Sequence, residues 1–301
     1  MSVLDHVSNV TIDDLSFDAD SVDPKKAAEV YKEHGALIVR GLQAPYLTDI
    51  KRDIEAVIAQ TLDLFDQAVK VAEGWKTPNG ALLLPAPEGF ERDKQLMTLP
   101  ITYMRSAAFL QSALDETTLD IAEAILGPDI ELKDMGQSLV KEPVGGHPKN
   151  LHQDAAYFEH RFEGPVGVLN YVVDTPVERG ALHVVPGSHS LGVLDHIDTF
   201  SHLGLDPGEW PWERALPLEG KAGDSIFFHV KTIHGSKPNT TDVARPVYIH
   251  RYRAANDYVV VSATTEANRA EAEKRRDEAT KENQEGLLVR GFRRWEAARQ
   301  K

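Results

Sequence analysis

The stretch GDSIFFHVKTIHGSKPNTTDVARPVYIHRYR, residues 223–253, contains two runs of β-branched and aromatic residues separated by glycine, proline and asparagine. Runs of this kind between turn residues are typical of β-strands. Similar runs precede it in IELKDMGQSLVK, GVLNYVVD and ALHVV. Many short strands between about residues 130 and 255 predict a mainly β fold, a double-sheet barrel or jelly roll.

The residues before this block are predicted to be mainly helical. Asp23, followed by a proline, and Gly35 bracket a short helix, after which ALIVRGL is expected to form a strand. Residues 45–70 have apolar residues three and four positions apart, as an amphipathic helix does, and a second helical region is expected between residues 101 and 126. The proline- and glycine-rich segment 73–95 is predicted to be a long loop.

The length of 301 residues allows one elaborated domain or two, because all-β barrels and sandwiches often reach this size as one domain. The sequence has neither an internal repeat nor a second strand-rich block, so we expect one domain. Its β core, at about 130–255, would be buttressed by an N-terminal helical part, 1–129, and followed by a charged, helix-prone tail, 256–301. The apolar residues of the tail are expected to pack back on the body, and they are Leu287, Leu288, Val289, Phe292 and Trp295.

Composition excludes several classes of function. The net charge of −14 argues against nucleic acid and anionic lipid as partners. The chain has no cysteine, so a bound metal would be held by His, Asp or Glu. Neither a signal-peptide pattern nor a run of about 18 apolar residues is present. These features predict a cytoplasmic monomer or homodimer that acts on a small molecule, with neither nucleic acid nor membrane as a partner.

A metal site is suggested by His152 and Asp154 in NLHQDAAYFEH, residues 150–160. In a strand, residues two apart point to the same face, so both side chains could enter the interior of the barrel. A second histidine would complete the 2-His-1-carboxylate triad of non-haem Fe(II) oxygenases. His234, just before a glycine turn, is the preferred third ligand, and three other histidines lie in strand or turn segments: His183, His189 and His229.

Arg245 begins the strand that follows His234. A 2-oxo acid that chelates a metal has a second carboxylate away from the metal, and this group needs an anchor. A guanidinium group can donate two parallel charge-assisted hydrogen bonds to such a carboxylate. Arg245 is the predicted anchor.

The order of these motifs resembles a known family. HxD is followed by GALHVVPGSH, by GD ahead of a strand, by HGSKPN and by an arginine, all within about residues 135–253. This series resembles the phytanoyl-CoA dioxygenase family of Fe(II)/2-oxoglutarate-dependent oxygenases. The resemblance implies a double-stranded β-helix core, Fe(II), 2-oxoglutarate as cosubstrate and O2. It implies iron ligands at His152, Asp154 and His234, and Arg245 on the distal carboxylate of 2-oxoglutarate.

The resemblance also indicates residues around the metal. Halogenating relatives lack the carboxylate ligand, so Asp154 favours oxygenation, desaturation or rearrangement. Gln137 and Asn150 are candidates for an amide that contacts the cosubstrate. Where many relatives have a tryptophan, this chain has Leu169 and Asn170; Asn170 could bind cosubstrate or substrate, or be a satisfied interior amide. The residues expected to line the substrate mouth are His147, Lys149, Tyr157, Phe158 and His160.

The predicted activity is oxidation of an unactivated C–H bond in a small molecule or biosynthetic intermediate, with release of succinate and CO2. Segments 71–97 and 191–215, the second with Trp210 and Trp212, are expected to cover the site. Two other classes remain open. A cupin-like metal-dependent hydrolase or isomerase would need no arginine anchor, and a non-catalytic jelly-roll module would need no intact triad.

Overall fold

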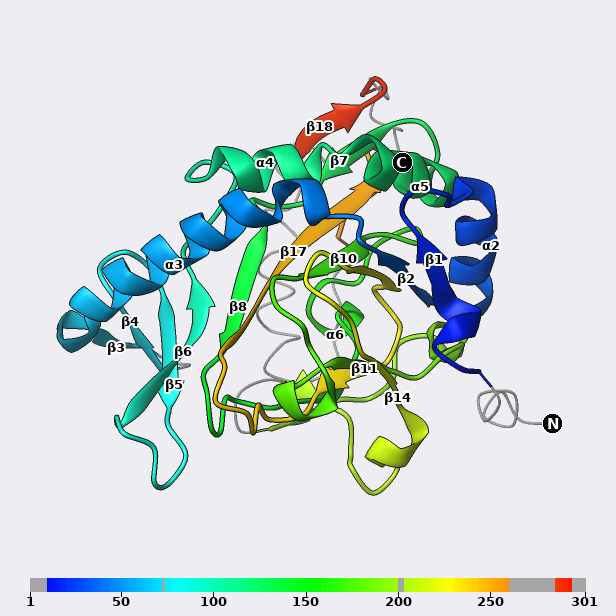
Figure 1. Cartoon of the computed structure of the whole chain (residues 1–301). Coiled ribbons are helices and arrows are strands. Elements are labelled where there is room, and N and C mark those ends of the chain that lie inside the picture. The colour runs from blue at the N-terminus through cyan, green and yellow to red at the C-terminus, as the bar shows by residue number, and fades with distance from the viewer. Residues whose placement is uncertain (1–9, 72–73, 200–202, 260–284, 294–301) are drawn as a thin grey trace, which may run out of the picture.

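The computed structural model describes residues 10–71, 74–199, 203–259 and 285–293, and it is dominated by a twelve-stranded, mostly antiparallel sheet (Figure 1). Its strands follow the order β1-β2-β15-β10-β17-β8-β6-β5-β4-β3, with β7 paired to β17 and β18 paired to β7. Their bounds are β1 (Ser16–Asp18), β2 (Ala36–Arg40), β3 (Val69–Val71), β4 (Gly74–Lys76), β5 (Leu82–Pro85), β6 (Lys94–Leu99), β7 (Ile130–Leu132), β8 (Gln137–Lys141), β10 (Val166–Tyr171), β15 (Ser225–His229), β17 (Arg245–Ala254) and β18 (Leu287–Arg290).

A second sheet has four strands in the order β14-β11-β16-β9, and a two-stranded sheet joins β12 to β13. Their bounds are β9 (Lys149–His152), β11 (Leu182–Val184), β12 (Ile197–Asp198), β13 (Leu203–Gly204), β14 (Leu216–Leu218) and β16 (His234–Ser236). One buried apolar cluster holds side chains from both of the larger sheets, including Leu169, Ile226 and Val184. The two sheets therefore pack face to face, which confirms the predicted mainly β fold.

Helices cover the other face of the large sheet, toward the top of Figure 1. They are α2 (Pro24–His34), α3 (Leu47–Asp63), α4 (Ala107–Ala113) and α5 (Glu116–Leu126). The shorter helices are α6 (Ala155–Phe158), η2 (Asp13–Leu15), η3 (Ala44–Tyr46), η4 (Phe65–Gln67), η5 (Val177–Arg179), η6 (Ser188–Leu191) and η7 (Trp212–Arg214). Within the described ranges, no helix is both long and apolar enough to cross a membrane.

The predicted ends of α2 are confirmed. Asp23 Oδ1 accepts hydrogen bonds from the backbone N–H groups of Lys25 and Lys26, at 2.9 and 3.4 Å. Gly35 ends the helix with φ of 73°, a left-handed conformation that glycine adopts without strain. A Cβ atom there would lie 2.5 Å from His189 Nδ1, so glycine also permits the close approach of that side chain.

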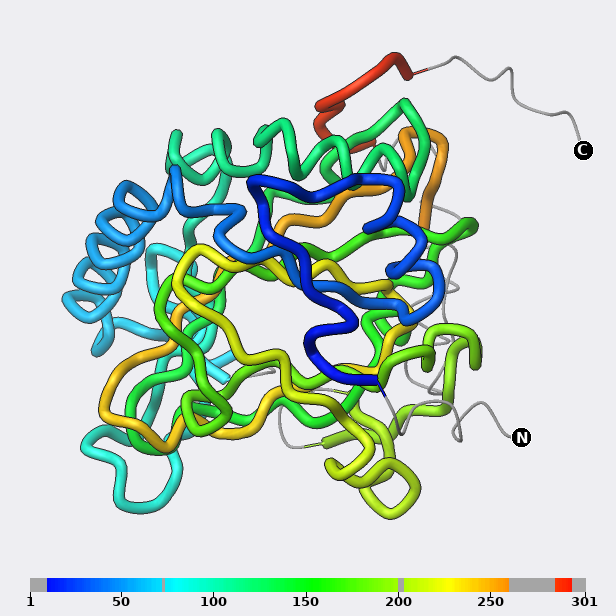
Figure 2. The backbone as a smooth tube through the Cα atoms, turned by 45° about the vertical axis from the view of Figure 1, so that its right-hand side comes forward, coloured from blue at the N-terminus to red at the C-terminus, as the bar shows by residue number. Residues whose placement is uncertain are grey.

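The ten residues of β17 separate two apolar layers. Tyr248 and Tyr252 belong to the cluster beneath the helices, whereas Val247 and Ile249 belong to the cluster between the sheets. This alternation is the period of two expected of a strand. Figure 2 shows the N-terminal segment, in blue, beside the yellow strands of the core, where β2 pairs with β15.

The predicted loop at residues 73–95 is wrong. This segment forms β4 and β5 and enters β6, which extend the large sheet through the pairing of β6 with β8. Leu83 and Leu96 are buried in the core cluster. Most of the glycines and prolines that suggested a loop lie at the turns between short strands, and the pairing that orders the segment comes from distant residues.

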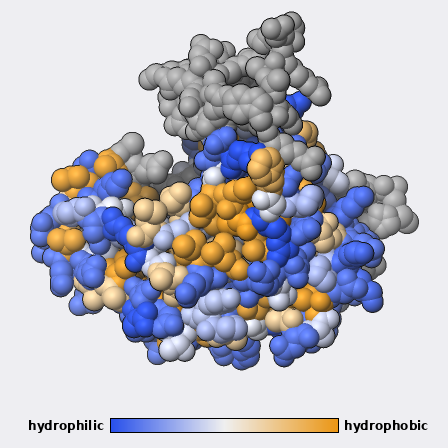
Figure 3. Space-filling view, turned by 90° about the horizontal axis from the view of Figure 1, so that it is seen from above, coloured by the Kyte–Doolittle hydropathy of each residue, from blue (hydrophilic) through white to orange (hydrophobic). Residues whose placement is uncertain are grey.

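The helical character expected for the tail is also wrong where the tail is described. Leu287–Arg290 is the strand β18, and it pairs with the edge of β7 opposite to β17, where backbone hydrogen-bonding groups would otherwise lack partners in the sheet. Val289 packs on the core, Leu288 is half-buried, and Leu287 and Phe292 are 44% and 72% exposed. Trp295 lies outside the described residues. Figure 3 shows apolar surface bordered by hydrophilic residues on the face seen from above.

Candidate active site

A cavity of about 630 Å³ lies between the two larger sheets. Strands β9 and β16 of the small sheet contribute His152 and His234, and strands β8 and β17 of the large sheet contribute Gln137, Arg245 and Arg251. The cavity thus brings together residues that lie up to 169 positions apart in the sequence, from Leu82 to Arg251.

Three side chains in this cavity form a compact group of metal-binding type. The Nε2 atoms of His152 and His234 each lie 3.7 Å from Asp154 Oδ1. Each residue offers one ligand atom, and these atoms lie within 4.8 Å of one another. Among the described residues this is the one cluster of three His, Cys, Asp or Glu with such geometry. The donor set matches the 2-His-1-carboxylate site of non-haem Fe(II) enzymes.

Backbone structure places the three candidate ligands. His152 and His234 are register partners on the antiparallel strands β9 and β16, so their rings approach to 4.3 Å between centroids. Asp154 lies past the end of β9, at the start of α6, with helical φ and ψ of −60° and −28°. Strand alternation, which predicted the approach of His152 and Asp154, is therefore not its cause; a turn brings the carboxylate toward the imidazoles.

Gln153, between the two ligands, holds this turn in place. Its side chain is fully buried and donates to the carbonyls of Gly192 and Lys231 at 2.8 and 2.6 Å. Its Oε1 accepts from the backbone N–H of Leu194 at 2.8 Å. Gln153 is therefore an anchor for the loop that carries Asp154.

The tautomers of both histidines follow from their backbone contacts. His152 Nδ1 lies 2.8 Å from the carbonyl of Asn150, and His234 Nδ1 lies 2.9 Å from the carbonyl of Thr232. A carbonyl only accepts, so Nδ1 carries a proton in each ring and Nε2 is the atom that faces Asp154. Both imidazoles are thus oriented to offer Nε2 to a metal.

Positive side chains gather at the far end of the cavity. Arg245 is 2% exposed, its Nε has no hydrogen-bond partner, and no described carboxylate forms an ion pair with it. Burial lowers the pKa of Arg245 to about 10, so the group stays charged at neutral pH. Burial, followed by the charges of Arg245 and Lys149, lowers the pKa of Lys141 well below its usual value. Lys141 Nζ contacts the carbonyls of His147 and Ser236. A buried cation without a counter-ion is costly, so this end is suited to an anionic ligand.

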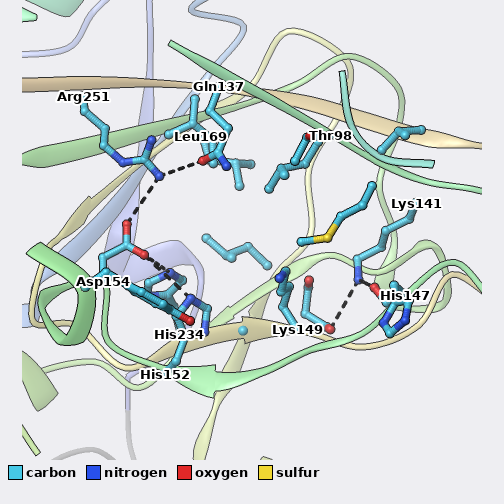
Figure 4. Close-up of a pocket in the computed structure, with 18 of the residues that line it drawn as sticks. Thr98, Gln137, Lys141, His147, Lys149, His152, Asp154, Leu169, His234 and Arg251 are labelled. Atoms are coloured by element: carbon cyan, nitrogen blue, oxygen red, sulfur yellow. Dashed lines mark hydrogen bonds and ion pairs between the residues drawn. The ribbon is translucent and has the colours of Figure 1, made fainter. Parts of the chain in front are cut away.

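The end of the cavity next to Asp154 has a different character. Arg251 Nη2 donates to Gln137 Oε1 at 2.9 Å and lies 3.6 Å from Asp154 Oδ2. Figure 4 shows Arg251, Gln137 and Asp154 on one side and Lys141 and His147 on the other. The cavity thus has two separate polar ends.

Several of the other predicted site residues line the cavity, and several do not. Gln137, His147, Lys149, Tyr157, Phe158 and Leu169 are among its lining residues. Asn170 is fully buried within the large sheet, where its amide bonds Ser225 and the carbonyls of Val168 and Tyr248. Of the two alternatives considered for Asn170, a ligand-binding residue or a hydrogen-bonded interior amide, the structure shows the interior amide.

Asn150 and His160 also lie outside the lining. Asn150 contributes the backbone carbonyl that orients His152. His160 is 3% exposed, bonds the carbonyl of Phe158 and faces Arg253 at 3.5 Å. Its position after α6 turns the ring toward the buried pair of Arg253 and Glu131 and away from the substrate space.

The other histidines considered as ligands lie elsewhere. His229 and His189 line a second cavity of about 1040 Å³, together with residues of α2 and α5. His229 Nδ1 accepts from the backbone N–H of Lys231, so its Nε2 donates to Glu163 at 3.0 Å. His183 is hydrogen-bonded to the carbonyl of Ala181 and packs edge-on against Trp212.

Several lining residues were not predicted from the sequence, among them Lys141, Arg251 and a wall from β5 and β6. One wall of the cavity comes from β5 and β6, and it consists of Leu82, Leu84, Met97 and Thr98. Part of segment 71–97, which was predicted to cover the site, therefore forms strands that line it. Arg251 lies an even number of residues after Arg245, and strand alternation in RPVYIHRYR is the signal that could have found it. Trp210 and Trp212, from the other predicted cover, pack with Leu151 and Val185 in a third apolar cluster.

Comparisons with known proteins agree with this geometry. The family model of phytanoyl-CoA dioxygenase (PhyH) matches residues 31–247. The "Probable alpha-ketoglutarate-dependent hypophosphite dioxygenase" of Stutzerimonas stutzeri is 31% identical over 47% of this chain and 51% of its own length. The "Probable phytanoyl-CoA dioxygenase" of Caenorhabditis elegans is 25% identical over 80% of this chain and 79% of its own. The chain spans about half of the length of the first of these relatives.

Solved structures show the same fold. The α-ketoglutarate-dependent carbocyclase SnoK of nogalamycin biosynthesis has a TM-score of 0.60 at 21% identity, over 80% of this chain and 87% of its own. The epimerase SnoN, in complex with Fe3+, α-ketoglutarate and nogalamycin RO, also has 0.60 at 21%, over 90% and 96%. These neighbours confirm the predicted jelly-roll class, although the sheets here do not close into a barrel.

Proposed function

Because the chain belongs to the phytanoyl-CoA dioxygenase family, we propose that it is a non-haem Fe(II)/2-oxoglutarate-dependent oxygenase acting on a small molecule. The observation that carries the proposal is one cavity with a compact His152, Asp154 and His234 cluster at one place and the unpaired, buried Arg245 at another. A hydrolase or isomerase with the same ligands would not need a second, anion-binding end.

In this proposal each polar group has a defined task. His152, Asp154 and His234 hold Fe(II), and the two backbone carbonyls at Nδ1 keep the imidazoles oriented. Arg245 holds the distal carboxylate of 2-oxoglutarate through charge-assisted hydrogen bonds. Burial, followed by the nearby charge of Arg245, lowers the pKa of Lys141, and the Lys141 amine adds hydrogen-bond donors to the same end of the cavity.

When bound, the metal and cosubstrate supply the oxidation of a C–H bond with O2, and succinate and CO2 are released. The chain supplies orientation and a dry cavity. Leu82, Leu84 and Met97 provide the apolar wall against which a substrate body can pack. Asp154, as a carboxylate ligand, favours oxygenation, desaturation or rearrangement over halogenation.

The first experiment adds Fe(II) and 2-oxoglutarate to the protein without oxygen. The visible charge-transfer band of the iron chelate is expected, and O2 should then convert 2-oxoglutarate to succinate. Asp154→Ala is the control that should abolish the band. Absence of both band and succinate would refute the proposal, whereas hydrolysis or isomerisation that ignores 2-oxoglutarate would favour the cupin-like class.

The proposal treats the chain as one catalytic domain, supported by the continuous sheet that joins β1–β6 to the core strands β8, β10, β15 and β17. A monomeric or homodimeric state and a cytoplasmic location stay predictions, which sedimentation and cell fractionation would test.

A further inference from the structure

Arg251 has more hydrogen-bond donors than its protein partners use. A guanidinium carries five N–H groups, and one of them donates to Gln137 Oε1 at 2.9 Å. The Asp134 and Asp154 carboxylates approach only to 3.6 Å, beyond hydrogen-bonding distance. Arg251 Nε is buried and has no partner. The residue is 8% exposed and lines the cavity, so it has unused donors in a nearly dry site.

Metal binding would increase this surplus. Coordination through Oδ1, the oxygen that faces both imidazoles, would draw the negative charge of Asp154 toward the metal. Arg251 would then keep as charge partners only Oδ2 of Asp154 and the Asp134 carboxylate, each at 3.6 Å. Asp134 is itself shared with Lys133, whose Nζ lies 3.6 Å from the same oxygen, Oδ2. A loaded site therefore presents a buried arginine with incomplete charge compensation, an arrangement that favours an anionic ligand.

The position of Arg251 identifies that ligand as something other than the cosubstrate. Arg245 and Arg251 lie on the same face of β17, six residues apart, so their Cα atoms are separated by about 20 Å. Arg245 belongs to the end with Lys141, and Arg251 lies beside the metal ligand Asp154. A group held by Arg251 would lie next to the metal, on the side away from Lys141 (Figure 4).

We propose that Arg251 binds an oxyanion of the substrate, a carboxylate or a phosphorus oxyanion, and so fixes the adjacent C–H bond near the metal. This inference rests on the proposed oxygenase function and names its substrate class. Two N–H groups in the planar fork of Arg251 can face two oxygens of such a group. Leu84 and Met97 remain available for an apolar substrate body.

The test uses three probes with one ring and different polar groups: phenylacetate, phenylphosphonate and the neutral phenylacetamide. The full chain is loaded with Fe(II) and 2-oxoglutarate without oxygen, the charge-transfer band is recorded, and each probe is titrated by calorimetry. Wild-type protein should bind at least one anion roughly tenfold or more tightly than the amide, since hydrogen bonds to charged groups are worth about 1.5–3 kcal/mol. The stronger anion distinguishes carboxylate from phosphorus oxyanion.

Arg251→Met should weaken anion binding at least about tenfold while the band remains, and Arg251→Lys should restore part of the affinity. Arg52→Met is the matched control, because it makes the same change at an exposed arginine of α3 that does not line the cavity. It should change anion binding less than about threefold. Arg251→Gln replaces the methionine variant if that variant does not fold.

Equal binding of amide and anions, no anion binding by wild type, or unchanged binding by Arg251→Met would each overturn the inference. Loss of the band in Arg251→Met would also overturn it, because Arg251 would then act by orienting Asp154. Failure of the proposed oxygenase function would give a different result: wild-type protein would show no charge-transfer band before any probe is added.

Discussion

Replacing Arg245 with methionine removes a buried cation from the far end of the cavity. Arg245 Nε has no hydrogen-bond partner, and no carboxylate in the described part of the chain forms an ion pair with this side chain. Two charge-assisted hydrogen bonds to a carboxylate are worth about 3–6 kcal/mol at about 1.5–3 kcal/mol each. Lys141 and Lys149 remain at the same end, so the lower value is expected. A loss of about 3 kcal/mol raises the Kd of 2-oxoglutarate roughly 100-fold.

The assay is an anaerobic titration of 2-oxoglutarate followed by the charge-transfer band, with Fe(II) affinity measured separately by calorimetry. Iron affinity should stay within about threefold of wild type, because Arg245 is not among the metal-binding cluster. The free energy of unfolding should not fall, because the change removes a buried charge that has no ion-pair partner. Arg245→Lys should recover part of the affinity.

Arg52→Ala, at an exposed arginine on α3, is the control and should leave cosubstrate affinity unchanged. A Kd for 2-oxoglutarate within threefold of wild type in Arg245→Met would refute the assignment of the anchor. Loss of iron and cosubstrate together would refute the division of the cavity into two ends.

Three further changes test other parts of the structure. Asp154→Ala should weaken Fe(II) binding by more than the roughly 10–100-fold typical of losing a residue that only supports a metal ligand, and calorimetry giving a smaller loss would contradict its role. Leu83→Ala should lower the free energy of unfolding by about 2–5 kcal/mol in chemical denaturation, because Leu83 is fully buried in β5; a loss below about 1 kcal/mol would show that β5 does not pack as described. Burial lowers the pKa of His250 to about 3, so the unfolded chain binds a proton there that the folded protein does not, and stability should fall as pH drops from about 6.5 toward 3. Replacing His250 with glutamine should reduce the slope of unfolding free energy in this range by about 1.4 kcal/mol per pH unit, and an unchanged slope would count against its burial as a neutral ring.

Local patterns were sufficient to predict much of the fold. Asp23 and Gly35 mark the ends of α2 because capping depends on neighbouring backbone groups. The core strands were found because their apolar runs end at turn residues. The strands of 74–99 were missed because β4–β6 are ordered by pairing with β8, about 40 residues away, and β18 was missed because β7 supplies its hydrogen bonds.

The candidate site shows the same contrast between residues found from local motifs and features that depend on distant contacts. His152, Asp154, His234 and Arg245 lie in short motifs, and the structure brings them to one cavity. The reason for the approach of Asp154 was not predictable from strand period, since it depends on a turn held by Gln153 and distant carbonyls. Asn170 could not be assigned from sequence, because whether an amide is satisfied depends on the strands beside it.

The strand β17 has a consequence for how this protein can diverge. Under the proposed role of Arg251, substitution at residue 251 would alter what is recognised beside the candidate metal site while residue 245 is untouched, so new specificities would be accessible by single codon changes. An insertion or deletion of one residue between these positions would instead exchange the two faces of the strand. An insertion would put His250, and a deletion Tyr252, in the place of Arg251 in the cavity. Mutational libraries aimed at new substrates should therefore vary the identity of residue 251 and preserve the length of the strand.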